Sequence, residues 1–185
     1  MIRPVRRTAH SYYVRDAAQA DLPAVLTMKA AAWREAYGHL RDEQFFQRAE
    51  ATLDRQIEHW RGIVGRGTTV WMAEDRRGNC VGMACAAPAR PERMRGRTDL
   101  PELELTSLYV LASAQGTGVA DALMDRALGK APAFLWVLAE NPRARSFYRR
   151  HGFHDDGAPV AMDGPWEGLQ EQLMVRGGTE SGQDA

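Results

Sequence analysis

The segment 115-QGTGVADALMDRAL-128 places two glycines and an alanine where a helix is expected to begin, directly after the apolar run 108-LYVLA-112. The first N–H groups of a helix have no partner within the helix, and the helix dipole adds partial positive charge there. Gly116, Gly118 and Ala120 carry at most a methyl group, so they would let an anion approach these N–H groups closely. The pattern indicates either a tight turn before a helix or a site for the phosphates of a ligand.

Two well-known phosphate-binding motifs do not match this segment. A dinucleotide-binding fingerprint G-x-G-x-x-G would need glycine where the chain has Asp121. It would also open the first strand–helix–strand unit of the chain instead of lying in the middle. A P-loop would need Gly-Lys-Ser/Thr, which this segment lacks. A nicotinamide-dependent oxidoreductase and a nucleoside triphosphatase are therefore disfavoured.

A tyrosine with catalytic potential lies in the second stretch of interest, 141-NPRARSFYRRHGF-153. Asn141 followed by proline predicts the N-cap and first turn of a helix, and Gly152 predicts its end. The phenol of Tyr148 could donate a proton to a leaving group. Its position next to Phe147 fits an aromatic core residue, and the residues alone favour this core role.

Two carboxylates precede the glycine segment. Glu104 lies in an otherwise apolar strand, and Glu102 falls on the same face two residues earlier. A carboxylate in an apolar strand can have a raised pKa and serve as a general base. Both could equally be exposed charges at the edge of a strand.

Apolar patterns predict the elements that must position these residues. A strand over 12–15 is followed by a helix that begins at Asp21-Leu22-Pro23, with the aspartate as its N-cap. The other expected elements are a helix over 42–60, a hairpin of strands 69–75 and 80–87, a strand over 103–111, a helix over 115–130, a buried strand over 133–138, a helix over 141–152, and two last strands from 153 onward and over 169–176. Segment 88–102, with three prolines, is expected to be a long irregular loop.

This order predicts an α/β fold of the α+β kind. The strand–helix–strand unit over 103–138 is expected to be a right-handed parallel crossover, and the hairpins make the sheet mixed. We expect one domain over 12–176, a flexible N-terminus over 1–11 and a disordered polar tail over 177–185.

Composition excludes several classes of function. Lys+Arg and Asp+Glu balance at 24 each, which gives no indication of binding to nucleic acid or a membrane. No stretch approaches the roughly 20 apolar residues of a membrane span, and the N-terminus lacks the apolar region of a secretory signal. Cys80 and Cys85 are expected to be reduced thiols of a cytoplasmic protein, without a metal site.

The two motifs together resemble the GCN5-related N-acetyltransferase (GNAT) family. Gln115-x-x-Gly118-x-Ala120 after a strand is similar to the family's acetyl-CoA signature, and residues 141–153 fit its pattern N-x-x-A-x-x-F-Y-x-x-x-G-F. Weaker matches are 14-VRDA-17 and 33-WREAYG-38. The resemblance covers roughly residues 12–176, and the two middle motifs occur in the expected order with a strand between them.

The resemblance implies a three-layer fold. A mixed, mostly antiparallel sheet of about seven strands would have helices on both faces and a central parallel pair, 103–111 and 133–138, that splays apart to hold acetyl-CoA. The pyrophosphate would bind backbone N–H groups of the glycine segment, and pantetheine would run along the first strand of the pair like an added strand. The residues expected to contact the cofactor are Leu108, Tyr109, Val110, Gln115, Gly116, Thr117, Gly118, Val119, Ala120, Asn141, Ala144, Phe147 and Tyr148.

The resemblance also implies a reaction, the direct attack of a primary amine on the thioester. Tyr148 would protonate the departing sulfur, and Glu104 would act as the base, with Glu102 or a chain of waters as competitors. Trp33, Tyr37 and Glu102 are candidates for the acceptor pocket, although the two aromatic residues could equally belong to the core. The arginines of 90–97 could meet an acidic acceptor or simply solvate their loop.

The expected acceptor is a small molecule, a peptide or a protein N-terminus, and family members are commonly homodimers. The expected enzyme is a cytoplasmic N-acetyltransferase of bacterial type. The alternative is a non-catalytic acyl-CoA-binding sensor, which would need only the glycine segment.

Overall fold

The computed structural model describes residues 12–177. The expectations for 1–11 and for the tail therefore lie outside the described residues, apart from residue 177. The chain divides into two units, which we treat separately: unit 1 contains 12–86 and 107–129, and unit 2 contains 87–106 and 130–177. The single domain over 12–176 stays a prediction.

Eight strands are hydrogen-bonded in the order β1-β2-β3-β4-β5-β8-β6, and β7 pairs with β8. The elements are β1 (Tyr13–Asp16), α1 (Leu22–Tyr37), α2 (Glu43–Glu50), α3 (Leu53–Gly65), β2 (Val70–Glu74), β3 (Cys80–Pro88), α4 (Pro91–Met94), β4 (Leu103–Val110), α5 (Val119–Ala127), β5 (Ala133–Leu138), α6 (Pro142–Arg150), β6 (His154–Asp155), β7 (Val160–Ala161) and β8 (Gln170–Arg176), with 3-10 turns η1 (Gln19–Asp21), η2 (Ala112–Ala114) and η3 (Gly164–Trp166). This mixed, mostly antiparallel arrangement confirms the expected fold class, with one strand more than predicted.

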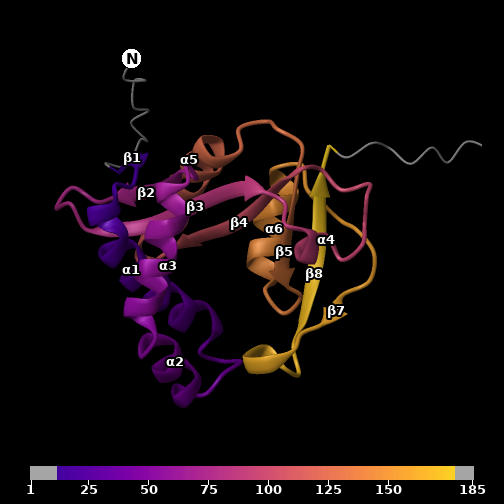
Figure 1. Ribbon diagram of the computed structural model, residues 1–185, viewed down its shortest axis with the longest axis horizontal. Coiled ribbons are helices and arrows are strands. Elements are labelled where there is room, and N and C mark those ends of the chain that lie inside the picture. Colours follow the sequence, from indigo (N-terminus) through magenta and orange to yellow (C-terminus); the bar gives the residue numbers. More distant parts are fainter. Residues whose placement is uncertain (1–11, 178–185) are drawn as a thin grey trace, which may run out of the picture. The chain divides into compact units, whose positions relative to one another are not determined.

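Unit 1 has helices on both faces of its strands. Strands β1, β2 and β3 form an antiparallel meander. Consecutive residues of β2 enter opposite cores, because side chains alternate along a strand: Met72 packs with residues of α1 and α3, whereas Ala73 packs with Val119 and Leu123 of α5. Figure 1 shows α1 and α3 side by side within this unit.

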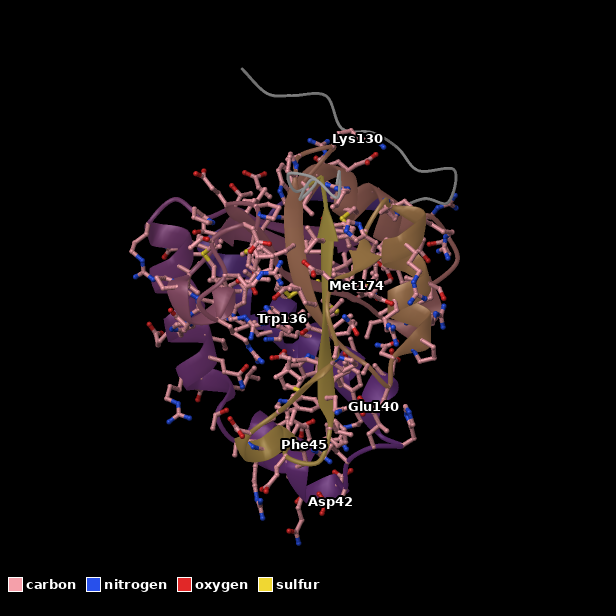
Figure 2. All side chains as sticks on the ribbon, turned by 90° about the vertical axis from the view of Figure 1, so that its right-hand side faces the viewer. Asp42, Phe45, Lys130, Trp136, Glu140 and Met174 are labelled. Atoms are coloured by element: carbon pink, nitrogen blue, oxygen red, sulfur yellow. The ribbon has the colours of Figure 1, made fainter. Side chains whose placement is uncertain are left out.

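Unit 2 is built on the long strand β8. Strand β5 pairs with β8 antiparallel over its whole length, from Ala133 opposite Arg176 to Leu138 opposite Glu171. Trp136 and Met174 lie on these two neighbouring strands (Figure 2). Strand β4 pairs with β5 in parallel at Glu104 and Phe134, which confirms the predicted parallel pair.

The predicted helix over 42–60 is wrong, because the chain forms two helices, α2 and α3, with a break at Ala51 and Thr52. The Thr52 hydroxyl donates to the backbone carbonyl of Ala49 at 2.8 Å, and the side-chain amide of Gln56 donates to the same carbonyl at 3.0 Å. Such side-chain bonds compete with the backbone pattern of a helix and favour its interruption.

Two further expectations are corrected. Segment 88–102 contains the short helix α4, so it is not a wholly irregular loop. Asp21 immediately precedes α1, but its carboxylate makes no cap bond to that helix. It accepts instead from the Ala18 amide at 2.8 Å and from the guanidinium of Arg15.

Among the residues that the structure describes, no helix is long and apolar enough to cross a membrane.

Candidate functional site

The glycine segment forms the connection from β4 to α5 in unit 1. The backbone φ is +77° at Gly116 and +85° at Gly118, values that residues with a side chain rarely adopt. A Cβ atom built at either glycine would have no protein atom within 4 Å. Glycine is therefore required here by the backbone, and the space beside both residues is open to a ligand.

Hydrogen bonds hold this connection in place. The Gln115 side chain donates to the carbonyl of Val110 at 3.0 Å, and the Thr117 hydroxyl donates to the carbonyl of Ala114 at 2.6 Å. Both side chains thus bond to the backbone of the loop and fix its shape. The Ala112 amide donates to Oε2 of Glu35 at 2.7 Å.

Glu35 is a residue that the sequence reasoning missed. It lies in α1 and ties that helix to the turn before the glycines. The sequence could have pointed to Glu35. This carboxylate lies between two aromatic residues in the stretch 33–38, which contributed to the family resemblance.

The helix start itself combines buried and open positions. Gly118 is the N-cap of α5, and the Val119 side chain that follows is fully buried in the core. Any ligand contact at residue 119 would therefore come from its backbone. Ala120 is half-buried. The four unpaired N–H groups of a helix start, with a glycine cap, suit an anion.

Strand β4 directs its side chains alternately to the two cores of unit 1. Leu108 and Val110 pack with the α5 side, and Tyr109 packs with the α1 and α3 side. The Tyr109 ring meets Trp33 edge-on, with 6.2 Å between centroids and 64° between planes. The structure thus brings together one expected cofactor residue and one expected acceptor residue. Tyr37 lies half-buried at the last residue of α1.

Helix α6 of unit 2 begins as predicted. Oδ1 of Asn141 accepts from the Ala144 amide at 3.0 Å, which confirms the N-cap. Tyr148 is 8% exposed, and its ring packs edge-on against Phe147 at 5.6 Å and Phe153 at 6.0 Å between centroids. The core role of the Tyr148 ring is therefore confirmed, and the chemical role of its phenol stays a prediction.

Glu104 and Glu102 have very different surroundings in unit 2. Glu104 is only 3% exposed, and the Nε of Arg93 donates to its Oε1 at 2.9 Å. Its other oxygen, Oε2, is buried and has no hydrogen-bond partner among the described residues. Glu102 is exposed and precedes β4. The exposed-edge interpretation is thus wrong for Glu104 and right for Glu102.

The arginines of 90–97 neither form a free basic patch nor only solvate their loop. Arg93 and Arg95 form ion pairs with the buried carboxylates of Glu104 and Glu171. The indole N–H of Trp136 donates to the Arg93 carbonyl at 3.0 Å, and the Arg95 guanidinium lies 4.3 Å from the centre of its ring.

Arg97 and Arg90 complete this set. Arg97 pairs with Asp99 and with Asp156 at 2.9 Å, and its hydrogen bond lowers the pKa of Asp99 to about 2. Arg90 lies 3.4 Å from Glu92 at the surface.

Among the described residues, no three His, Cys, Asp or Glu side chains are grouped so that they could hold a metal ion.

Comparison with known proteins points in one direction. The family model described as acetyltransferase (GNAT) family matches residues 32–153, more than half of the chain. Uncharacterized N-acetyltransferases of Mycobacterium bovis and Mycobacterium tuberculosis are 39% identical over 67 residues, which is 33% of this chain and 43% of each relative. The chain therefore spans less than half the length of these curated relatives.

Solved structures are similar over most of the chain. A histone acetyltransferase HPA2 and related acetyltransferase from Corynebacterium glutamicum is 25% identical with a TM-score of 0.64, over 90% of this chain and 96% of that one. The PaiA N-acetyltransferase from Thermoplasma acidophilum, in complex with coenzyme A, is 16% identical with a TM-score of 0.64, over 90% and 98% of the two chains. At 16% identity, the similarity to the Thermoplasma acidophilum protein shows a shared fold and nothing more.

Proposed function

Since the chain belongs to the acetyltransferase (GNAT) family, we propose that it is an N-acetyltransferase that moves the acetyl group of acetyl-CoA to a primary amine by direct attack in a ternary complex. The observation that carries this proposal is the glycine connection of unit 1, whose backbone is fixed by side-chain bonds and faces open space at both glycines. The acceptor is the amine of a small molecule, a peptide or a protein N-terminus.

Acetyl-CoA supplies an acetyl group that is activated as a thioester. In our proposal the backbone N–H groups of 116–120 bind its pyrophosphate, with the positive end of α5 behind them. The backbone of Leu108 and Val110 holds the pantetheine arm, since their side chains are directed into the core. One N–H of this strand also polarises the thioester carbonyl.

Glu104 takes the proton of the acceptor amine. Arg93 occupies Oε1 and orients the carboxylate, which leaves Oε2 able to accept a further hydrogen bond. Buried carboxylate oxygens without a partner are unusual in folded proteins, and an amine donor would satisfy this one. Glu102 is the weaker competitor because it is exposed.

Tyr148 donates a proton or a hydrogen bond to the departing sulfur. Its ring is fixed by Phe147 and Phe153, so the phenol keeps one orientation. Asn141 and Ala144 start the same helix, and through it they position Tyr148. A cytoplasmic location and a homodimer stay predictions of the sequence.

The test is a pair of measurements on the purified chain. Calorimetry with acetyl-CoA and with CoA measures binding, and a thiol assay measures CoA release with a panel of small amines, amino acids and peptides. Saturable binding and amine-dependent CoA release are the expected results. Binding without release for any acceptor would favour the non-catalytic sensor, and no binding of either ligand would refute both functions.

A further inference from the structure

Lysine is nearly absent from this chain. Of its 24 lysine and arginine residues, only Lys29 and Lys130 are lysines. An arginine stays protonated in proteins, whereas a lysine can lose its proton and act as a nucleophile. The chain therefore contains two side-chain amines, and they lie in opposite environments.

Lys29 lies inside a cage of aromatic rings in unit 1. Its Nζ is 4.9 Å from the ring centre of Trp33, 5.7 Å from that of Trp60 and 5.7 Å from that of Tyr109. The side chain is half-buried, and no carboxylate within the described part of the chain forms an ion pair with it. Burial alone lowers the pKa of this ammonium, so the neutral amine is more accessible here than in water.

Lys130 has none of these features. It is exposed and follows α5 (Figure 2). It therefore serves as an internal reference for a lysine that reacts only from solution.

The cage of Lys29 includes the strand that the proposed function assigns to the pantetheine arm. Tyr109, one wall of the cage, stands in β4 between Leu108 and Val110. Helix α1 carries Lys29 and, four residues later on the same face, Trp33. The same helix binds the turn before the glycines through Glu35. Helix α1 thus joins the amine to both the glycine connection and β4, all within unit 1.

We propose that Lys29 is an acetyl acceptor, so that the protein acetylates itself at this position. The inference rests on the proposed function, because the acetyl donor is the acetyl-CoA of that site. The neutral Nζ attacks the carbonyl carbon of the thioester, a C–N bond forms and the C–S bond breaks. The sulfur leaves with the electron pair and takes up the proton that the nitrogen loses. The products are Nε-acetyl-lysine and CoA, and no other reactant is consumed.

The rings that attract the Lys29 cation can also accommodate the acetylated product. An acetamide has no charge to desolvate, and aromatic rings form an apolar environment for its methyl group. Acetylation also removes the positive charge that lies over the rings of Trp33, Trp60 and Tyr109. Since Tyr109 is in β4, the modification changes the surroundings of a β4 side chain.

The experiment uses the full chain and acetyl-CoA without an added amine. Peptide mass spectrometry follows acetylation at Lys29, at Lys130 and at the N-terminal amine over time. We expect Lys29 to gain one acetyl group faster than Lys130, on the order of tenfold or more, because the proposal has its amine react with acetyl-CoA bound along β4, whereas Lys130 reacts from solution. In urea, where the cage is lost, the two lysines should react at similar rates.

Three variants separate the explanations. Lys29→Arg keeps the cation over the rings and should abolish the modification at residue 29, whereas Lys130→Arg should leave it unchanged. Gly118→Ala should slow acetylation of Lys29 and not of Lys130, because only the first depends on bound acetyl-CoA. Thermal unfolding identifies a variant that fails to fold, and Lys29→Gln then replaces Lys29→Arg.

Equal acetylation of the two lysines in the folded protein, or no acetylation of Lys29 in a protein that binds acetyl-CoA, would overturn the inference. Calorimetry on the same samples distinguishes this failure from a failure of the proposed function. A chain that binds acetyl-CoA and acetylates an added amine, but not Lys29, loses only the inference. A chain that binds no acetyl-CoA loses the proposed function as well.

Discussion

The Nε of Arg93 donates to Oε1 of Glu104 at 2.9 Å, while Oε2 of the same carboxylate is buried without a partner among the described residues. A buried polar group without a hydrogen bond costs about 1–3 kcal/mol. This asymmetric carboxylate is therefore expected to gain a donor when the enzyme is loaded with its acceptor. Unlike most surface ion pairs, the pair holds a carboxylate that is only 3% exposed.

The first prediction concerns Glu104→Gln. The amide keeps an oxygen for Arg93 but accepts no proton, so kcat with the best amine should fall by about 10²-fold. Affinity for acetyl-CoA should be unchanged by calorimetry. Glu171→Gln is the matched control, because Glu171 is also buried and pairs with Arg95. Equal losses in both variants would mean that Glu104 contributes charge balance and not proton transfer.

The second prediction concerns Tyr148→Phe. The new ring keeps the packing against Phe147 and Phe153, so the melting temperature should change little. Loss of the phenol should lower kcat by about 10²-fold while the Kd for acetyl-CoA stays close to wild type. Tyr13→Phe removes the hydroxyl of an exposed tyrosine and should have no effect. Turnover at the wild-type rate in Tyr148→Phe would remove this residue from the reaction.

The third prediction compares two glycines with the same backbone constraint. Gly118 and Gly67 have φ of +85° and +94°, and neither has a protein atom within 4 Å of a built Cβ. Alanine should cost about 1 kcal/mol of stability at each position. Only Gly118→Ala should also weaken acetyl-CoA binding, by on the order of tenfold, which corresponds to about 1.4 kcal/mol. Titration calorimetry and urea unfolding of both variants test this, and equal affinities would place the pyrophosphate elsewhere.

The fourth prediction is a pH dependence of stability. Arg15 makes two hydrogen bonds to Asp21, at 2.5 and 2.9 Å, and two to Glu74, at 2.8 and 3.2 Å. The bond from Arg15 lowers the pKa of Asp21 in the folded state. The pair therefore stabilises the fold above the unfolded pKa, near 4, and this contribution is lost as the pH falls through the lower folded pKa.

Asp21→Asn should accordingly reduce the free energy of unfolding by about 1 kcal/mol at neutral pH. The difference from wild type should shrink as the pH is lowered toward about 3. Urea unfolding at both pH values measures it. Asp16→Asn, which removes an exposed neighbouring charge, is the control. A difference for Asp21→Asn that is the same at both pH values would contradict the assignment.

Local patterns predicted most elements of this fold. The strand–glycine–helix connection, the Asn141 cap and the parallel pairing of β4 with β5 all follow from residue types at short spacing. The break between α2 and α3 escaped because it depends on hydrogen bonds of Thr52 and Gln56, residues that also fit a continuous helix.

The ion pairs of segment 88–102 could not have been predicted in this way. Arg95 and Glu171 are 76 residues apart in the chain, and only the assembled sheet brings them together. Sequence reasoning placed Glu104 in an apolar strand correctly, but its partner Arg93 lies in a segment expected to be irregular. The polar contacts that determine the chemistry of a buried group mostly join residues far apart in the chain, so they cannot be predicted from local patterns in a single sequence.

Arg95 has consequences for how this chain can diverge. It is the one residue other than glycine with a positive φ, 49°, in the described part of the chain. Its backbone would accept glycine more easily, but glycine could neither pair with Glu171 nor stack on Trp136. Related chains should therefore inherit positions 95, 136 and 171 together. A lineage that replaces the arginine by glycine is expected to replace the acid and the indole as well.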